Sequence, residues 1–454
     1  MTTYDAIVIG TGQAGPFLAR RLAAVGMNVA VIERGLIGGT CGNTGCTPTK
    51  ALLASAEAAH IARRAAEFGV SIAGPVNVNM KRVKARKDAI VEATRNSVLA
   101  GLSVENCTLY REQARFIAPD EVRVGGTVLK SERIFINVGG RASVPSGLDQ
   151  VEYLTNSSMM DIDFVPRHLV IVGGSYVGLE FAQMYRRFGS KVTVIEMGPR
   201  LIGREDEDVS AAILEILERE GISVRLNAKC VSAARSGAEI AATVDCATGA
   251  PVESGTHLLI ATGRRPNTDD LGLDEAGIAH DGRGFITVDD QLRTNVPGVW
   301  ALGDCNGKGA FTHTAYNDFE IVAANLLDDD PRRVSDRIPT YALFTDPPLG
   351  RAGLTEAEAR NTGKGLLVGK RAMTQVARAV EKSETQGFMK IVIDADTKQI
   401  LGAAILGPGG DEVIHSILDL MYAKAPYTVM QRAVHIHPTV SEHIPTMLGE
   451  LGLL

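Results

Sequence analysis

The sequence lacks three features that would place the protein in a membrane or on a nucleic acid. No uninterrupted apolar run among its 454 residues approaches the length that spans a bilayer. The first residues, Met1–Asp5, contain no basic region or cleavage site of a signal peptide. The net charge is only −6, so neither nucleic acid nor an anionic membrane is expected as a partner. We therefore expect a cytoplasmic protein.

Cysteine is also scarce, and its distribution excludes a disulfide scaffold. Of the six cysteines, only Cys41 and Cys46 lie close together in the sequence. In a reducing compartment, a single close pair is typical of a catalytic or metal-binding site. A zinc site needs more ligands than this pair supplies, and no second close pair follows. We therefore expect a redox-active pair and no metal site.

What the sequence does contain is a dinucleotide-binding unit at its start. A strand, a glycine-rich turn, a helix and a second strand follow one another over residues 6–32. Gly10 permits the tight turn, Gly12 lets a pyrophosphate approach the backbone, and Gly15 lets helix and strand pack closely. The pyrophosphate would lie at the helix N-terminus, and Glu33 would accept a hydrogen bond from a ribose hydroxyl.

The same pattern recurs over residues 168–196, with one departure. Gly173 and Gly178 take the first and third glycine positions. Ser175 takes the second position, where it adds a side chain near the expected pyrophosphate. An acid, Glu196, again closes the unit. Two such units in one chain predict an enzyme that binds two nucleotides.

Further strands end in turns that would return the chain to a nucleotide. Two of them end at Gly139 and Gly263, and a third ends at Asp304, whose carboxylate can bind a chain of sugar hydroxyls. From residue 338 onward the pattern changes to α+β, which predicts a separate C-terminal domain. The expected fold class is α/β, with two Rossmann-like dinucleotide-binding domains and a C-terminal α+β domain.

The cysteine pair lies within residues 38–50, just after the first nucleotide unit. The four residues between Cys41 and Cys46 allow a disulfide that stays reducible. Pro48 suits the first turn of a helix predicted over 49–68, so Cys46 lies at or just before a helix N-terminus. The partial positive charge there favours a thiolate. Cys41 lies further out, where it can meet a substrate.

A histidine and an acid near the C-terminus complete the candidate groups. His437 can move protons near neutral pH, as thiol–disulfide exchange requires. Glu442, five residues further on, could orient the imidazole ring. Taken alone, His437 is better explained as a buried structural histidine.

With these motifs in place, the chain resembles the flavin-dependent pyridine nucleotide–disulfide oxidoreductases. That family includes glutathione reductase, dihydrolipoamide dehydrogenase and mercuric reductase. Its active-site pattern, Gly-Gly-Thr-Cys-x-Asn-x-Gly-Cys-x-Pro-x-Lys, matches residues 38–50 at every fixed position. The resemblance covers essentially the whole chain. The domains that it implies are an FAD domain at 1–147 and 265–335, an NAD(P) domain at 148–264 and a dimerisation domain at 336–454.

The resemblance also implies roles for individual residues. Lys50 and Glu180 would form an ion pair beside the flavin ring, and Tyr176 would gate the nicotinamide pocket. Ala114 would contact adenine through its backbone. The implied FAD contacts are Gly10, Gly12, Gly15, Glu33, Gly39, Thr40, Lys50, Ala114, Gly139, Asp304, Thr312 and His313. The implied NAD(P)H contacts are Gly173, Ser175, Tyr176, Gly178, Glu196 and Gly263.

In the implied reaction, hydride passes from NAD(P)H through FAD to the Cys41–Cys46 disulfide and on to a small disulfide. Cys46 would face the flavin and Cys41 the substrate. His437, in a cis His-Pro peptide and held by Glu442, would act as acid and base on the cysteines of a partner subunit. An obligate homodimer follows from this arrangement.

Two choices within the family stay open. Glu196 favours NADH, because an acid there repels a 2′-phosphate, yet the nearby Arg200 leaves NADPH possible. Residues 311–319 look like the mercuric-reductase branch, but the chain lacks that branch's C-terminal cysteines and has His437 in place of a tyrosine. Alternatives to the leading prediction are therefore reduction of Hg(II) or Cu(II), dihydrolipoamide dehydrogenase activity, and a flavoprotein redox sensor or binding subunit.

The variable positions around the cysteines differ from those of the common family members. Small or polar residues replace aliphatic ones at Gly42, Thr44 and Thr47. We expect a smaller and more polar surface around Cys41, and the sequence does not name the substrate.

Overall fold

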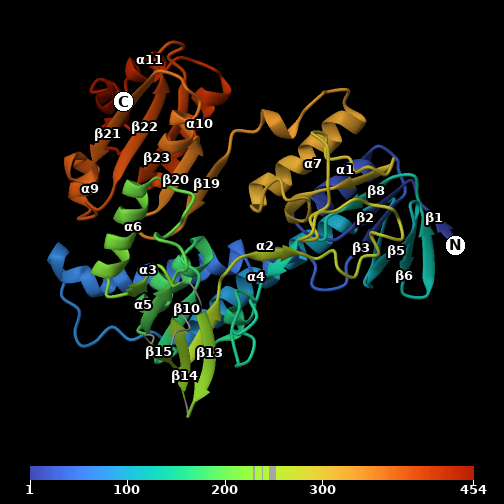
Figure 1. Ribbon diagram of the computed structural model, residues 1–454, viewed down its shortest axis with the longest axis horizontal. Coiled ribbons are helices and arrows are strands. Elements are labelled where there is room, and N and C mark those ends of the chain that lie inside the picture. Colours follow the sequence, from blue (N-terminus) through green and yellow to red (C-terminus); the bar gives the residue numbers. More distant parts are fainter. Residues whose placement is uncertain (229–230, 238, 245–251, 454) are drawn as a thin grey trace.

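The structure, a computed structural model, describes residues 1–228, 231–237, 239–244 and 252–453. Cys230 and Cys246 lie outside the described residues. Figure 1 shows the elements gathered in three groups, with the C-terminal strands in one of them. Within the described ranges, no helix combines the length and the apolar character needed to cross a membrane.

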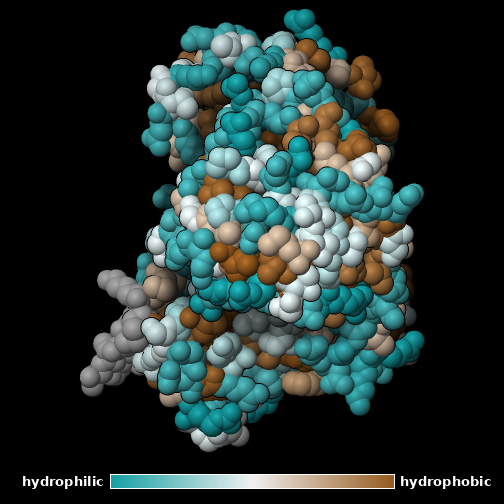
Figure 2. All heavy atoms as spheres, turned by 90° about the vertical axis from the view of Figure 1, so that its right-hand side faces the viewer, coloured by the Kyte–Doolittle hydropathy of each residue, from teal (hydrophilic) through white to brown (hydrophobic). Residues whose placement is uncertain are grey.

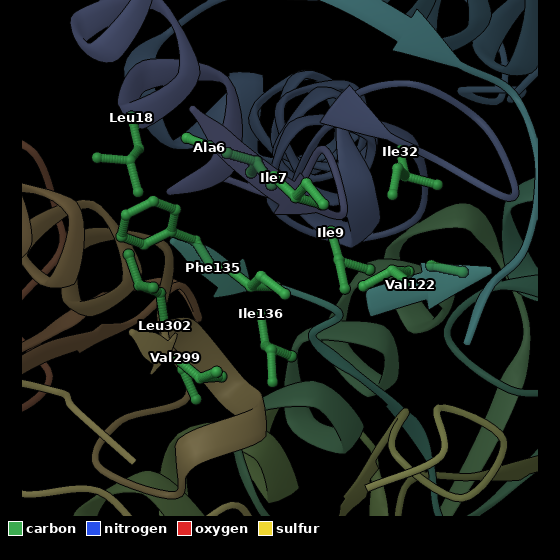
Figure 3. Close-up of a cluster of buried hydrophobic side chains, with 14 of the residues drawn as sticks. Ala6, Ile7, Ile9, Leu18, Ile32, Val122, Phe135, Ile136, Val299 and Leu302 are labelled. Atoms are coloured by element: carbon green, nitrogen blue, oxygen red, sulfur yellow. The ribbon is translucent and has the colours of Figure 1, made fainter. Parts of the chain in front are cut away.

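The first group is built on a parallel sheet whose middle strand, β2, is entirely buried. Buried parallel strands are continuous apolar runs, which explains the sequence Ala-Ile-Val-Ile of β2. In spatial order the sheet contains β18 (Val299–Ala301), β8 (Ile134–Ile136), β2 (Ala6–Ile9), β3 (Val29–Ile32) and β4 (Cys107–Tyr110). Its edge strand β18 comes from far along the chain. Figure 3 shows how side chains from β2, β8 and β18 meet in one core.

Helices and a second sheet flank this core. Pro16 stands in the first turn of α1 (Gly15–Ala24), where proline is favoured, and α1 packs against α7 (Thr312–Leu327). The second sheet contains β1 (Thr2–Thr3), β7 (Thr127–Lys130), β6 (Glu121–Val124) and β5 (Ala114–Ala118). Figure 2 views the molecule from the right-hand side of Figure 1, where the second sheet lies, and hydrophilic and hydrophobic residues are interspersed on that face.

Three helices follow β3, and the first two carry the cysteine pair. They are α2 (Gly39–Asn43), α3 (Cys46–Arg64) and α4 (Met80–Leu102). The Asn79 side chain caps α4 by accepting from the Arg82 N–H. The helix predicted from residue 49 thus begins at Cys46. A 3-10 turn over Ala65–Phe68 continues it to the predicted end.

The second group repeats the parallel arrangement. Its sheet contains β12 (Ser223–Arg225), β11 (Lys191–Ile195), β10 (His168–Val172) and β16 (His257–Ile260) in that order. Helices α5 (Tyr176–Phe188) and α6 (Glu207–Arg219) belong to this unit. An antiparallel sheet contains β13 (Val231–Ser236), β14 (Glu239–Val244) and β15 (Val252–Gly255). The chain leaves the first group through β9 (Gly140–Ala142) and returns to it through β17 (Arg264–Pro266). These two strands pair antiparallel with each other.

The C-terminal group is an antiparallel sheet with helices. Its strands, in order, are β19 (Thr340–Leu343), β20 (Leu349–Gly353), β23 (Ile400–Leu406), β22 (Phe388–Asp394), β21 (Leu366–Ala372) and β24 (Gly452–Leu453). Its helices are α8 (Glu356–Arg360), α9 (Ala377–Glu381), α10 (Gly410–Tyr422), α11 (Thr428–Gln431) and α12 (His443–Leu448). Two Rossmann-like parallel units and a C-terminal α+β unit confirm the predicted fold class.

Candidate active site

A cavity of about 880 Å³ runs along the first nucleotide unit and past both cysteines. Every residue expected to contact FAD lines it except Gly15. Gly15 lies beneath the turn instead, where a Cβ atom would be 2.2 Å from the Gly10 carbonyl oxygen. Gly15 therefore has the packing role that its position in the fingerprint predicts.

Two polar groups at the glycine turn fit a dinucleotide such as FAD. Glu33 accepts hydrogen bonds from the Thr11 N–H (2.9 Å), the Thr11 hydroxyl (2.7 Å) and the Gly35 N–H (2.8 Å), so its carboxylate is held at the turn. The Asn137 side-chain N–H₂ is buried and has no described partner. It lies at the turn, because a Cβ on Gly12 would be 3.3 Å from it. A phosphate oxygen at this turn would satisfy that donor.

The segment that carries Cys41 is a short helix, which the sequence analysis did not predict. A Cβ on Gly39 would lie 2.6 Å from the Gly12 Cα, so only glycine lets this helix pack against the nucleotide turn. The Asn43 side chain donates to the Ile37 and Gly39 carbonyl oxygens at 2.9 Å each and accepts from Arg95. The fixed asparagine of the motif therefore holds the cysteine segment in shape.

Cys41 and Cys46 are free thiols in the structure, and their environments push their pKa values apart. The hydrogen bond from Cys41 lowers the pKa of Cys46 to about 6; partial desolvation opposes this, and the Thr312 hydroxyl and the Lys50 charge assist it. That same bond, together with burial, raises the pKa of Cys41. Near neutral pH, Cys46 is therefore the thiolate and Cys41 the thiol. This direction agrees with the sequence prediction, although Cys41 rather than the helix terminus is the main cause.

Lys50 and Glu180 meet as the resemblance implies, with their Nζ and Oε2 atoms 2.9 Å apart. Glu180 is buried, and its other oxygen accepts from the Phe344 N–H at 3.3 Å. The Lys50 ammonium also lies 4.2 Å from the centre of the Phe344 ring. The pair thus ties α3 to α5 and to the chain after β19, beside the cysteines.

Asp304 is held by a network that sequence reasoning missed. Its carboxylate accepts from the Arg264 Nε–H at 3.2 Å. The buried Asp318 on α7 accepts from the Gly303 N–H (2.8 Å) and the Asn306 side chain (2.9 Å), and it pairs with Arg337 (2.5 Å). Asp318 is followed by Glu320 on the same helix, so the sequence offered no signal that set Asp318 apart, and its partners could not be read from the sequence.

A second cavity, of about 390 Å³, lies along the second nucleotide unit. Gly173, Ser175, Tyr176, Glu196 and Gly263 line it. Tyr176 also lines the first cavity, as a residue between two nucleotides would. The remaining predicted contact, Gly178, packs beneath the turn, since a Cβ there would lie 2.0 Å from the Gly173 carbonyl oxygen.

The acid of the second unit is held in the same way as that of the first. Glu196 accepts from the Gly174 N–H at 2.6 Å and from the Gly198 N–H at 2.7 Å. Arg200 does not line either cavity among the described residues; its guanidinium faces Glu207 (3.5 Å) and the Gly203 carbonyl (3.3 Å).

His437 and Glu442 form a pair that lies apart from both cavities among the described residues. The His437 Nδ1 is 3.0 Å from a Glu442 oxygen, and the His437–Pro438 peptide is cis. The His437 side chain is 74% exposed in the single chain, so its own chain does not bury it as the structural histidine considered from the sequence would be buried. Val434 and Ile436 beside it are exposed too.

Comparison with known proteins gives matches over nearly the whole chain. Residues 4–318 match the family described as pyridine nucleotide-disulphide oxidoreductase, and residues 339–448 match the dimerisation domain of these proteins. The probable pyridine nucleotide-disulfide oxidoreductase RclA of Escherichia coli is 35% identical over 98% of each chain. The mercuric reductase of Streptomyces lividans is 35% identical, covering 97% of this chain and 94% of its own. The dihydrolipoyl dehydrogenase of Thermus scotoductus is 34% identical, covering 97% and 96%.

Solved structures match equally well. The Cu(II) complex of the HOCl-induced flavoprotein disulfide reductase RclA from Escherichia coli superposes with a TM-score of 0.90 at 33% identity. That match covers 99% of this chain and all of the other.

Proposed function

The chain belongs to the pyridine nucleotide-disulphide oxidoreductase family and is thus an FAD-dependent NAD(P)H disulfide oxidoreductase, and on this premise we propose that Cys41 and Cys46 are its redox-active pair. One observation carries the proposal. The two thiols, one with its pKa lowered to about 6 and the other with its pKa raised, share a cavity with the predicted FAD contacts. A low thiol pKa next to a second cysteine is typical of thiol–disulfide exchange.

FAD, when bound, supplies the transfer of an electron pair between the pyridine nucleotide and the cysteine pair. Glu33 would hold its ribose, the Asn137 amide its pyrophosphate and Asp304 its sugar-alcohol chain. Each of the three lines the first cavity. The ion pair of Lys50 and Glu180 would lie beside the reacting ring.

The two cysteines would divide the thiol chemistry between them. The Cys41 sulfur attacks one sulfur of the substrate disulfide, which breaks its S–S bond and releases the first thiol. The Cys46 thiolate then attacks the Cys41 sulfur, releases the second thiol and forms the Cys41–Cys46 disulfide. The substrate thereby gains two electrons and the pair loses two. Because the pKa of Cys41 is raised, its attack needs a base to take the proton.

We assign this base to His437 of the partner subunit. The dimerisation domain supports a homodimer of the family type. The exposed His437, its bond to Glu442 and its position outside its own chain's cavities support a role across that interface. Deprotonating Cys41 and protonating the departing thiol are the two tasks of this imidazole. Glu442 orients it through Nδ1, which leaves Nε2 free for the sulfur.

NADH is proposed as the reductant in preference to NADPH. The carboxylate of Glu196 lines the second cavity and would repel a 2′-phosphate, whereas Arg200 faces Glu207 instead. The measurement is kcat/KM for each nucleotide with the same acceptor. We expect NADH to be favoured about tenfold or more, since repulsion of one phosphate is worth at least 1.4 kcal/mol. A preference for NADPH would contradict the assignment.

The proposed domain division keeps the FAD domain at 1–147 and 265–335, the NAD(P) domain at 148–264 and the dimerisation domain at 336–454. It is supported by β18, which returns to the first sheet after the second unit is complete. A cytoplasmic location also stays a prediction.

A small disulfide is the proposed substrate, and Cu(II) is a second candidate. The structural similarity to a flavoprotein disulfide reductase solved as a Cu(II) complex favours that ion over others. The test is oxidation of NADH by the FAD-loaded protein against a panel of disulfides, Cu(II) and Hg(II), with a separate assay of NAD⁺ reduction by dihydrolipoamide. Disulfide turnover that disappears in Cys41→Ser would support the proposal. Turnover that survives Cys41→Ser would overturn it, and dihydrolipoamide turnover would identify a lipoyl dehydrogenase.

A further inference from the structure

Arg204 is a cation in the second cavity whose charge is not balanced by a nearby acid. It lines this cavity with the glycine turn and Tyr176. Among the described residues, no carboxylate lies within ion-pair distance of its guanidinium. Instead, the guanidinium lies 5.1 Å from the ring centre of Tyr341 and 5.9 Å from that of Phe311. These cation–π contacts orient the group while leaving its N–H donors available.

The two residues after Arg204 are acids, and each forms an ion pair with a basic residue other than Arg204. These ion pairs hold the backbone on which Arg204 lies. Glu205 is fully buried and accepts from Arg351 at 3.1 and 3.2 Å. Asp206 pairs with Lys390 at 2.9 Å. Neither acid is therefore free to neutralise Arg204, and both anchor the segment to the C-terminal sheet. In Figure 1, α6, which follows this segment, lies beside the C-terminal strands.

The aromatic rings place Arg204 on the Tyr176 side of the cavity. Phe311 stacks on Tyr341 at 5.7 Å and contacts the Tyr176 ring at 5.5 Å. Tyr176 is the residue expected at the nicotinamide, whereas Glu196 is expected at the adenosine ribose. Arg204 thus lies toward the nicotinamide half of the nucleotide that the proposed function requires.

A pyrophosphate at this turn needs a donor that the fingerprint does not fully provide. Ser175 replaces the glycine that brings the backbone close to the phosphates. A planar guanidinium can donate two parallel hydrogen bonds to one phosphate group. We propose that Arg204 binds the pyrophosphate of the pyridine nucleotide, at the phosphate of its nicotinamide half. This inference rests on the proposed function.

Two other arginines line the same cavity, and their contacts differ. Arg264 donates to Asp304 at 3.2 Å and to the Gly140 carbonyl, so it is already engaged. Arg265 lies near Asp269, whose pKa its charge helps to lower. Arg265 is therefore the competing candidate for a phosphate ligand.

The test is binding of non-reducing probes to the FAD-loaded protein by calorimetry. The probes are NAD⁺, ADP-ribose, which keeps both phosphates, and AMP, which keeps only the phosphate of the adenosine half. Arg204→Leu should weaken binding of NAD⁺ and ADP-ribose at least about tenfold, since one hydrogen bond to a charged group already has that effect, and change binding of AMP less than twofold. Arg204→Lys should recover part of the loss.

Arg200→Leu is the matched control, since it removes an arginine of the same segment that lies outside the cavity, and it should bind ADP-ribose within twofold of the parent. The inference is overturned if Arg204→Leu binds ADP-ribose as the parent does, or if Arg265→Leu carries the loss instead. Failure of the parent itself to bind NAD⁺ and ADP-ribose would overturn the pyridine-nucleotide site, a result distinct from an inert Arg204.

Discussion

The Cys46 sulfur lies 3.1 Å from the Thr312 hydroxyl oxygen, although 266 positions separate the two residues in the chain. Each of them opens a helix, because α3 begins at Cys46 and α7 begins at Thr312. Two helix N-termini therefore meet at one sulfur atom. Both contribute partial positive charge there, which favours the thiolate over the thiol.

Removing the Thr312 hydroxyl should raise the pKa of Cys46. At present this pKa is lowered to about 6, so the thiolate persists above that pH and is protonated below it. In Thr312→Val we expect the pKa to rise by about one, the value of one hydrogen bond to a charged group. The measurement is the pH dependence of alkylation of the reduced protein. Thr312→Ser keeps the hydroxyl and should match the parent; identical profiles for all three proteins would contradict the role.

The ion pair near Cys46 should act on that thiol in two opposite directions. The Lys50 charge lowers the pKa of Cys46, whereas the Glu180 charge raises it. Lys50→Met should therefore raise this pKa and Glu180→Gln should lower it, each by about 0.5 to 1. Alkylation profiles again provide the measurement. Lys84→Met removes a charge from another helix ion pair, that with Asp88, and should have no effect. Shifts of equal sign in the first two variants would refute the electrostatic account.

Loss of Glu442 should slow turnover without unfolding the protein. Its pKa is lowered, against the effect of desolvation, by the Thr439 N–H and by His437. In Glu442→Gln the ring of His437 loses its charged partner, and kcat for disulfide reduction should fall about tenfold. The kcat/KM for NADH should stay unchanged, because the proposed role of His437 lies in the half-reaction with the disulfide, and the KM for NADH should fall together with kcat. Rapid-mixing experiments should show the NADH-dependent phase at its normal rate, and a slowing of that phase would argue against a role in thiol exchange.

Asp318 should control affinity for FAD although it does not line the cavity among the described residues. It holds the turn of Gly303 and Asn306, next to Asp304. Asp318→Asn also leaves Arg337 without its charge partner, and we expect the dissociation constant of FAD to rise roughly tenfold. Titration of the apoprotein with FAD measures this. Asp328→Asn, in the exposed pair with Arg21, is the control that should retain the parent affinity.

The buried pair of Arg351 and Glu205 should contribute strongly to stability. Both side chains are almost entirely buried, so Arg351→Met leaves an unpaired carboxylate inside the protein. We expect a loss of about 3–5 kcal/mol in the free energy of unfolding. Arg360→Met removes an arginine from the more exposed pair with Glu356 and should cost about 0.5 kcal/mol or less. Equal denaturant midpoints for the two variants would contradict this ranking.

Much of the fold could be predicted because its signals are local. The glycine turns at Gly10 and Gly173, with an apolar strand before and a helix after, specify each parallel unit within about thirty residues. The position of Cys46 at a helix start also followed from a local signal, the nearby Pro48. The short helix around Cys41 did not, because it depends on the contact of Gly39 with Gly12, which is tertiary.

Most of the side-chain contacts that position the site residues could not be predicted from the sequence. Asp318, Arg264 and Asn137 contact groups from other parts of the chain. The hydrophobic periodicity of a sequence predicts local helices and strands but not which distant residues come into contact. The Lys50–Glu180 pair was expected only through the family resemblance, since each residue alone reads as an ordinary helix charge. The roles of the individual site residues and the domain boundaries stay predictions for the experiments above.

The separation of His437 from its own chain's cysteine pair has a genetic consequence. Under the proposed arrangement, each active site takes its thiols from one polypeptide and its imidazole from the other. A chain with Cys46→Ser and a chain with His437→Ala would each be inactive in pure form. Co-expressed, they should assemble mixed dimers in which one site contains two defects and the other none, so two null alleles would complement each other.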